Sequence, residues 1–407
     1  MSAPDVAIIG AGPAGLIAAE TVASAGASVV VYERMPSVAR KFLMAGRGGL
    51  NLTHSEALDV FLTRYGDAPQ LLRAAIEAFP PPRLRDWAHG LGQETFIGSS
   101  GRVFPKTFKA SPLLRAWLAR LESLGVRFAL RHQWSGWNED GALRFETPQG
   151  QSIIKPRATI LALGGASWPR LGSDGGWREI LSAQGIAIGD LKPANSGFHV
   201  AWSEAFRERF EGQPLKTVML GFEAHTSRGE IVMTRDGIEG GGIYAVSAAL
   251  REGVAARGHA TLAIDLRPDT ALPEIVARLA RPRGKQSIAT FLRKALALPP
   301  VAIGLLHEAA AHRGTKLATM TPGEVATLIR ALPVRVEGTA SLARAISTAG
   351  GVSFAAIDSD FSLRKRPDVF VAGEMLDWEA PTGGYLLQAS FATGVAAGKG
   401  ALARLGL

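Results

Sequence analysis

Short apolar runs alternate with a helical repeat at the start of the chain. Residues 6–9 are continuously apolar, residues 13–25 carry apolar side chains at helical spacing, and residues 28–32 form a second apolar run. A glycine-rich turn separates the first run from the helical stretch. Short buried runs predict strands and the 3.6-residue repeat predicts a helix, so we expect a strand–helix–strand unit with parallel strands.

The apolar pattern changes between residues 193 and 346. Runs such as "LKTVMLGFEAHT" and "ATLAIDL" alternate like antiparallel strands up to residue 267, and "EIVARLAR" and "IATFLRKAL" then show helical spacing. A chain of 407 residues is also long for one core. We therefore predict an α/β fold in which residues 1–192 and 347–407 form a Rossmann-like domain. Residues 193–346 are inserted as a substrate domain, a β-barrel (193–267, mostly β) plus a helical part (268–346).

The first glycine turn has the pattern of a dinucleotide site. Gly10, Gly12 and Gly15 form G-x-G-x-x-G at the strand-to-helix corner. The first glycine permits the tight turn, the second admits a pyrophosphate against bare backbone, and the third lets helix and strand pack closely. Pro13 suits the first helical turn, and with Ala14 it opens the helix whose amides would face the phosphates.

The end of the second predicted strand supplies an acidic residue. Glu33 lies 18 residues beyond Gly15, near the spacing at which a carboxylate meets the ribose of the adenosine, and Arg34 follows it. A structural glycine turn is the alternative. The combination of strand, helix, strand and terminal acid favours a bound dinucleotide, NAD or FAD.

Two later segments favour FAD. The run "ATILALGGASW" ends in a strand-to-turn corner that contains Ala162, Gly164 and Gly165, and "DVFVAGE" leads to Gly373 and Glu374. FAD is a long molecule that must be held at its flavin end as well as at its nucleotide end. The chain of a flavoprotein therefore returns to the same sheet later. A nicotinamide dehydrogenase, which would continue with further βα units, is the alternative.

These motifs resemble the glutathione-reductase-type FAD fold. More narrowly, they are similar to a family of bacterial two-domain flavoproteins that includes aminoacetone-oxidase-like enzymes, a bile-acid enone reductase and a ribosomal RNA dihydrouridine synthase. The likeness runs from Asp5 to Gly394 and is weakest between about 195 and 330.

The resemblance implies positions for the flavin end of the cofactor. Gly373 and Glu374 would approach the ribityl chain and pyrophosphate. Backbone amides in the "TGGYLLQ" helix entry would face N1 and O2 of the flavin, where reduced flavin carries negative charge that a helix N-terminus stabilises. The residues concerned are Gly383, Gly384, Tyr385 and Leu386.

The segment "RKFLMAGRGGLNLTH" (40–54) also matches the family, with departures. It has Gly49 where the family has arginine, Leu50 for a cysteine and His54 for an asparagine. Arg47 is expected to supply the displaced guanidinium, and a thiol proton donor is excluded here. The resemblance places the following residues of this loop at the cofactor: Lys41, Gly46, Arg47, Gly48, Gly49 and Asn51.

The remaining candidates are weaker. The strand predicted over residues 125–134 places Trp134 where backbone groups of this fold usually contact the adenine. Its indole could equally belong to the core. In "TRDGIEGGGIYAVS" (234–247), Arg235 replaces a histidine that related proteins carry. The sequence does not identify a proton donor; the candidates by position are Arg235, Tyr244, His199 and Tyr385.

Composition narrows the chemistry further. The chain has no cysteine, which excludes disulfides, thiolate metal sites and thioether attachment, so FAD would be non-covalent and the setting reducing and cytoplasmic. No metal is expected, because His307 and His312 are five residues apart and cannot share one zinc on a helix. No membrane segment is expected either, because Glu20 and glycine–proline turns interrupt the apolar stretch from Val6 to Tyr32. No second G-x-G-x-x-G is present, so NAD(P)H would act as a transient reductant.

Three functions are compatible with these features. The first is an FAD oxidoreductase that reduces a C=C bond, with a uracil in ribosomal RNA as the favoured substrate. The second is an oxidase of a small amine or aminoketone, and the third is a redox-silent RNA-binding or assembly protein. The net charge of +9 favours RNA, which a basic group in the insertion would hold: Arg281, Arg283, Lys285, Arg293 and Lys294.

Overall fold

The chain forms two compact units in the computed structural model, which describes residues 3–46 and 48–407. The first unit comprises Met1–Lys192 with Ser347–Leu407, and the second comprises Pro193–Ile346. Strands β11 (Lys192–Ala194) and β19 (Ser347–Ala349) pair where the chain passes from one unit to the other. The predicted α/β class with a Rossmann-type domain is confirmed.

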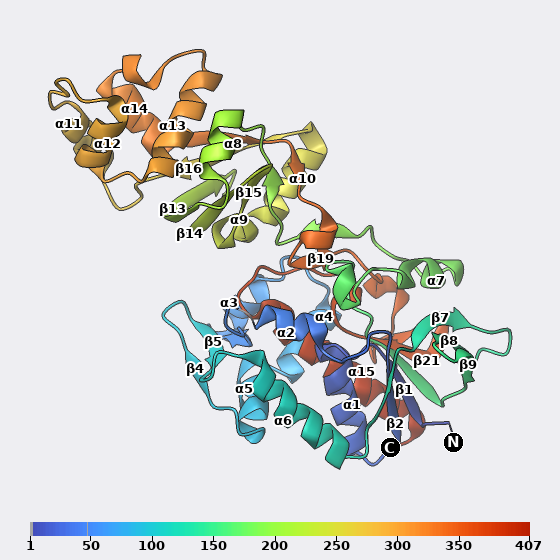
Figure 1. The fold of residues 1–407 in the computed structure, drawn as a ribbon. Coiled ribbons are helices and arrows are strands. Elements are labelled where there is room, and N and C mark those ends of the chain that lie inside the picture. The colour runs from blue at the N-terminus through green and yellow to red at the C-terminus, as the bar shows by residue number, and fades with distance from the viewer. Residues whose placement is uncertain (1–2, 47) are drawn as a thin grey trace. The chain divides into compact units, whose positions relative to one another are not determined.

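A parallel sheet lies at the centre of the first unit (Figure 1). Its order among the described residues is β20-β21-β10-β1-β2-β6, with only β20 antiparallel to its neighbour. Strands buried on both faces read as continuous apolar runs, which is why the sequence pattern located β1, β2 and β10. The strands are β1 (Val6–Ile9), β2 (Val29–Glu33), β6 (Arg127–Leu130), β10 (Ala158–Leu161), β20 (Ser362–Leu363) and β21 (Arg366–Val371).

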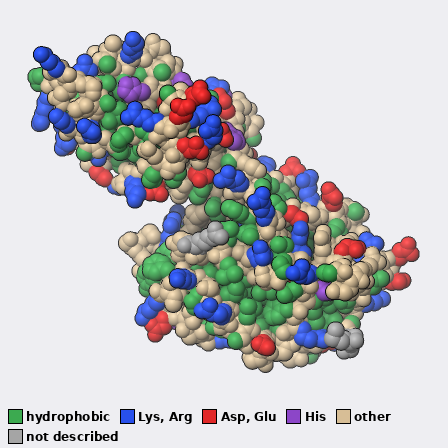
Figure 2. Space-filling view, in the orientation of Figure 1, with side chains coloured by type: hydrophobic (Ala, Val, Ile, Leu, Met, Phe, Trp, Pro, Cys, Tyr) green, Lys and Arg blue, Asp and Glu red, His purple; other side chains and the backbone are tan. Residues whose placement is uncertain are grey.

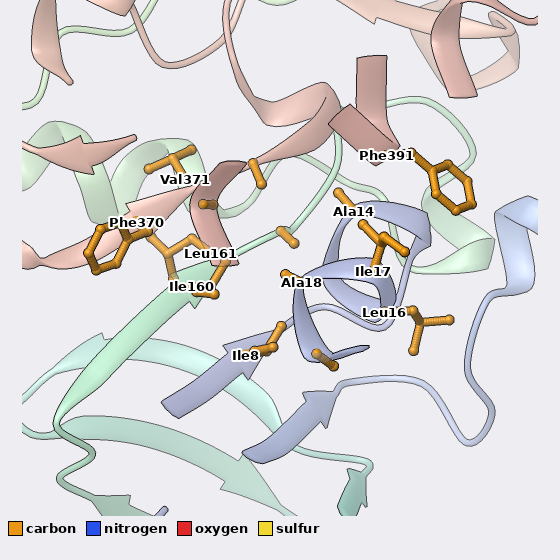
Figure 3. Close-up of a cluster of buried hydrophobic side chains, with 14 of the residues drawn as sticks. Ile8, Ala14, Leu16, Ile17, Ala18, Ile160, Leu161, Phe370, Val371 and Phe391 are labelled. Atoms are coloured by element: carbon orange, nitrogen blue, oxygen red, sulfur yellow. The ribbon is translucent and has the colours of Figure 1, made fainter. Parts of the chain in front are cut away.

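Helices α1 (Pro13–Ser24) and α15 (Tyr385–Leu405) pack against this sheet and against each other. Figure 3 shows Ile17 of α1 and Phe391 of α15 in the same buried cluster as Ile8 and Leu161 of the sheet. The two helices approach closely at Gly394, where a Cβ would lie 2.4 Å from the carbonyl oxygen of Ala14. The chain start and the chain end therefore form one core around the glycine corners.

Smaller elements surround this core. The sheet β7-β8-β9 packs on the central sheet through Tyr32 and Phe145, whose rings stack at 4.5 Å. The further elements are α2 (Arg40–Ala45), α3 (Leu58–Thr63), α4 (Gln70–Ala78), α5 (Pro81–Gly90), α6 (Ala110–Ser123), α7 (Trp177–Ala183), β3 (Thr53–His54), β4 (Thr95–Ile97), β5 (Arg102–Pro105), β7 (Gln133–Trp137), β8 (Leu143–Thr147) and β9 (Gly150–Ile154).

The strand predicted over residues 125–134 is wrong in its extent. Strand β6 ends at Leu130, and Arg131 takes a left-handed φ of +58° that breaks the extended run. Trp134 therefore belongs to β7 of the smaller sheet, where it is 6% exposed. An apolar run with a single turn inside it does not reveal such a break.

A seven-stranded sheet forms the second unit, in the order β17-β16-β13-β14-β15-β12-β18 over the described chain. The two ends of this order, β17 and β18, are separated only by Glu337, so one chain segment closes the sheet into a small barrel. The strands are β12 (Phe198–His199), β13 (Pro214–Phe222), β14 (His225–Thr234), β15 (Gly237–Glu239), β16 (Ala260–Asp265), β17 (Leu332–Val336) and β18 (Gly338–Thr339).

Helices of the second unit share an apolar core with this barrel. Three of them interrupt the β-rich part, and four follow β16 before β17 returns the chain to the sheet. They are α8 (Glu204–Phe210), α9 (Gly241–Ala245), α10 (Ser247–Arg257), α11 (Leu272–Leu279), α12 (Ile288–Leu296), α13 (Pro300–His312) and α14 (Pro322–Arg330). Among the described residues of the whole chain, no helix is both long and apolar enough to span a bilayer.

Candidate functional site

The three glycines of the first corner have different surroundings. Gly10 has a φ of +105°, and a Cβ on it would lie 2.3 Å from the carbonyl oxygen of Ala162. A Cβ on Gly15 would lie 1.9 Å from the carbonyl oxygen of Gly10. Gly12, the N-cap of α1, has no protein atom within 4 Å of such a Cβ. Gly10 and Gly15 thus serve the packing, whereas Gly12 leaves bare backbone beside open space.

A cavity of about 390 Å³ opens at this corner, at the carboxyl ends of β1, β2, β10 and β21. This is where open parallel sheets bind their ligands. The predicted residues that line it are Gly10, Gly12, Pro13, Ala14, Glu33, Arg34, Lys41, Trp134, Ala162, Gly164, Gly373 and Glu374. Gly15 and Gly165 do not line the cavity and support its wall.

Glu33 is held in place by backbone amides. The N–H of Ala11 donates to one carboxylate oxygen at 3.0 Å, and the N–H of Met35 donates to the other at 2.8 Å. Burial raises the pKa of Glu33 above its usual value, although both amides act to lower it. A carboxylate has about four lone-pair sites, so two acceptor sites remain for hydroxyl donors in the cavity.

Lys41 and Glu374 form an ion pair beside the cavity. The Lys41 ammonium donates to Glu374 at 2.7 Å and to the hydroxyl of Ser167 at 2.7 Å. The second carboxylate oxygen of Glu374 accepts the N–H of Thr348 at 3.0 Å. A Cβ on Gly165 would lie 2.3 Å from the hydroxyl oxygen of Thr348. Glu374 therefore joins three chain segments at this wall, and the Lys41 ammonium is neutralised there.

The described residues of the loop after α2 lie outside the cavity lining. Gly46 needs its bare backbone, since a Cβ would lie 2.6 Å from the Cβ of Ala110, and Gly49 has a φ of +112°. Gly48 has no such neighbour within 4 Å, and Arg47 lies outside the described residues. The side-chain oxygen of Asn51 is buried and finds no hydrogen-bond donor among the described residues. Buried polar atoms are normally paired, so this acceptor is available to a ligand.

The same neighbourhood holds the start of α15. A Cβ on Gly384, which has a φ of +98°, would lie 2.4 Å from the Cα of Thr53, so this corner abuts the strand that follows Asn51. Gly383 has a φ of +139°, and Tyr385 and Leu386 are the first residues of α15. First-turn amides of a helix lack intrahelical partners. The corner therefore presents donors beside Thr53, two residues after Asn51.

The Tyr385 side chain is engaged elsewhere. Its hydroxyl donates to Glu56 at 2.6 Å, and Arg64 pairs with the same carboxylate at 2.7 Å. Burial and the Glu56 carboxylate hold the pKa of Tyr385 well above its usual value. Burial acts to raise the pKa of Glu56, but Arg64 and Tyr385 outweigh it and the pKa is lowered. The Tyr385 hydroxyl therefore stays protonated at neutral pH and donates its hydrogen bond to Glu56.

The other three proton-donor candidates belong to the second unit. His199, on β12, is exposed, and its ring lies 3.4 Å from the carbonyl oxygen of Asp236. Arg235 is exposed and lies 3.6 Å from Glu211. Tyr244, on α9, is half-buried, and burial followed by the charge of Glu239 raises its pKa. These three side chains therefore differ in their surroundings.

Residues 172–177 also contribute to the cavity lining, and none of their side chains was predicted from the sequence. Trp177 donates its indole N–H to the carbonyl oxygen of Gly164 at 2.8 Å, and Ser173 donates to that of Gly165 at 2.9 Å. Asp174 forms an ion pair with Arg34 across the cavity rim. The signal was the "GSDGGW" stretch (172–177), which begins seven residues after Gly165. Within residues 3–46 and 48–407, no cluster of three metal-ligating side chains occurs.

Comparisons with known proteins agree with this architecture. The profile of the family described as "HI0933-like protein Rossmann domain" matches residues 4–400. A 3-dehydro-bile acid delta(4,6)-reductase of Clostridium scindens is 26% identical over 98% of this chain and 99% of its own length. A ribosomal RNA dihydrouridine synthase of Haemophilus influenzae is 24% identical over 94% of both chains.

Solved structures share the fold at low identity. A 3-ketosteroid delta1-dehydrogenase from Sterolibacterium denitrificans superposes with a TM-score of 0.55 at 12% identity, covering 99% of this chain and 100% of the other. The open conformation of a flavocytochrome c3 fumarate reductase gives a TM-score of 0.54 at 16% identity, covering 99% of this chain and 78% of the other.

Proposed function

The chain belongs to the HI0933-like Rossmann-domain family and is an FAD-dependent oxidoreductase, and from this premise we propose that it reduces a C=C bond conjugated to a carbonyl group. The names of both curated relatives imply this chemistry. The bile-acid reductase acts on double bonds conjugated to a 3-oxo group, and the C5=C6 bond of uracil is conjugated to its C4 carbonyl. A hydride acceptor of this kind is the feature that the two substrates share.

The residues of the first unit fit the proposed cofactor. Gly12 and the start of α1 would receive the pyrophosphate, and the free acceptor sites of Glu33 would receive the ribose hydroxyls. The unpaired oxygen of Asn51 and the first amides of α15 would hold the isoalloxazine ring, one as acceptor and the others as donors. When bound, the flavin supplies a hydride from N5. The chain's own residues bind and orient it without a covalent link.

We favour a uracil in ribosomal RNA as the substrate. The observation that carries this choice is a set of cations without acidic partners on the α11–α12 segment. None of them makes an ion pair with another described residue, and Figure 2 shows Lys and Arg side chains gathered over this part of the second unit. The five residues are Arg281, Arg283, Lys285, Arg293 and Lys294. Uncompensated cations of this kind bind phosphates.

The reaction balances with one hydride and one proton. The hydride would go to C6 of the uracil, which is the β-carbon of the conjugated carbonyl, and a proton from the protein or water would go to C5. NAD(P)H is the proposed source of the two electrons. Arg235, Tyr244 and His199 remain the proton-donor candidates, because the Tyr385 hydroxyl already donates to Glu56.

Mass spectrometry of ribosomal RNA tests this substrate directly. The RNA is taken from a strain whose gene for this chain has been deleted and from its parent. Loss of one dihydrouridine from the deletion strain, restored by the intact gene, is the expected result. Unchanged RNA would remove the RNA assignment.

A small-molecule enone is the second candidate substrate. It is favoured by the bile-acid reductase relative, which matches this chain over nearly the full length of both. Steady NAD(P)H oxidation with a steroid-like enone, and none with uracil in RNA, would select it.

A further inference from the structure

A cleft of about 290 Å³ in the second unit lies among α8, α12 and α13, apart from the cavity described above. Its floor is apolar and includes Phe206, Phe210 and Ile303. Its polar lining includes Arg209, Arg293 and His307, all exposed. Helix α8 and the consecutive helices α12 and α13 thus bring two guanidinium groups and an imidazole to one hollow.

The positive charge of this cleft is only partly compensated. Arg209 lies with its guanidinium 5.3 Å from the ring centroid of Phe210, and neither it nor Arg293 makes an ion pair with a described residue. Among the described residues, Glu308 is the only carboxylate that lines the cleft. It accepts the N–H and the hydroxyl of Ser203, at 2.9 and 2.6 Å, and so holds the residue that caps α8. One structural carboxylate therefore faces two unpaired arginines.

The imidazole adds a group whose charge depends on its surroundings. Burial lowers the pKa of His307, Arg209 lowers it further, and Glu308 opposes both. Arg293 also lines the same cleft. An anion between these groups would offset the effect of Arg209, so His307 would bind it more strongly once protonated.

We propose that this cleft binds a backbone phosphate of single-stranded RNA, with Arg209 and Arg293 as the ligating cations. The inference rests on the proposed reduction of a uracil in RNA. The cleft is favoured for a polymer because further cations without ion pairs lie in the same chain segment, at Lys294 on α12 and at Lys285 and Arg283 before it. A single small anion would need only the cleft.

The test measures binding of a labelled oligouridylate to the full-length, FAD-loaded protein by fluorescence anisotropy at several salt concentrations. The variants are Arg209→Gln, Arg293→Gln and the double substitution. The matched control is Arg278→Gln, a half-buried arginine of the same unit that pairs with Glu274 at 2.5 Å. Flavin content and thermal unfolding show whether each variant is folded.

The cleft is proposed to hold one phosphate, so its loss in the double variant should lower the slope of log K against log salt by about 0.7 for a single strand. The affinity of this variant should fall roughly tenfold or more at low salt, because each contact is a hydrogen bond to a charged group. The control should retain both the slope and the affinity. A purely structural role of the arginines would not change the salt slope in this way.

The inference is overturned if the double variant binds oligouridylate with the affinity and slope of the unchanged protein. It is also overturned if inorganic phosphate binds the cleft and oligouridylate does not, which would make the cleft a small-anion site. Failure of the proposed function would look different: RNA would bind and the arginine variants would weaken it, but no uracil would be reduced by any of them. In that case the phosphate site stands.

Discussion

At the scale of single residues, the glycines of the first corner separate packing from ligand binding. Gly12→Val should leave the fold intact and abolish FAD binding, because its side chain would enter the cavity and meet no protein atom within 4 Å at its Cβ. Gly10→Ala should instead lower the free energy of unfolding by roughly 1–3 kcal/mol, because of its φ of +105° and the overlap with Ala162. Thermal unfolding and flavin content of the two variants measure both effects.

Gly26→Ala is the control for the glycine pair. Gly26 also has a positive φ, but no atom lies within 4 Å of its Cβ and it does not line the cavity. This variant should bind FAD like the unchanged chain. If Gly12→Val bound FAD normally, the pyrophosphate would not lie at this corner.

Glu33 links cofactor binding to pH. Glu33→Gln should weaken FAD binding by about 1.5–3 kcal/mol through the loss of charge-assisted hydrogen bonds. The ribose hydroxyls prefer the ionised carboxylate, so affinity should be full at neutral pH and fall as the pH drops through the pKa of Glu33, which burial raises above 4.5. Without FAD the sign is reversed: the stability that protonated Glu33 contributes at low pH is lost as the pH rises through this raised pKa.

Titration of FAD affinity against pH in both proteins measures this linkage. The amide that Glu33→Gln introduces does not titrate, so that variant should lack the acidic fall assigned to Glu33. An identical acidic fall in both proteins would mean that another group controls binding.

At the scale of elements, the start of α15 is tied to α3 and the segment before it. Tyr385→Phe removes the hydroxyl that donates to Glu56 and should lower the free energy of unfolding by about 1.5–3 kcal/mol. The folded pKa of Glu56 is lowered, so its contribution to stability is present above the unfolded pKa and is lost on acidification. The variant should lose less stability between neutral and acidic pH than the unchanged chain.

Denaturant unfolding at two pH values checks this, together with FAD affinity. The backbone of Tyr385 is unchanged in the variant, so FAD affinity should be largely retained. A large loss of flavin without loss of stability would instead place the hydroxyl itself at the cofactor.

The elements that the sequence revealed are those with local signals. Strands β1, β2 and β10, and helices α1 and α15, follow from apolar runs and glycine corners. The ion pair beside the cavity joins residues far apart in the chain, Lys41 and Glu374, which are 333 residues apart. A single sequence carries no local signal for such partners, and likewise none for the arginine pair of α8 and α12.

At the scale of the whole molecule, bound FAD should raise the free energy of unfolding. A ligand that binds only the folded state stabilises it by about 2.7 kcal/mol at a concentration of 100 Kd. The protein should therefore unfold at a higher temperature with FAD than after its removal, and acid should release the FAD intact because the chain has no cysteine. A colourless protein whose unfolding temperature does not respond to FAD would contradict the assignment of the cavity.

The central claim is that the flavin reduces a C=C bond conjugated to a carbonyl, and anaerobic reoxidation tests it most directly. The FAD-loaded protein is reduced with NADPH or dithionite without oxygen, and is then mixed with uracil-containing ribosomal RNA or with a steroid-like enone. We expect that flavin absorbance returns and that one substrate gains two hydrogens by mass spectrometry. If the flavin stays reduced with both, yet an amine reduces the oxidised flavin and oxygen then yields peroxide, the chain is an oxidase and the central claim is contradicted.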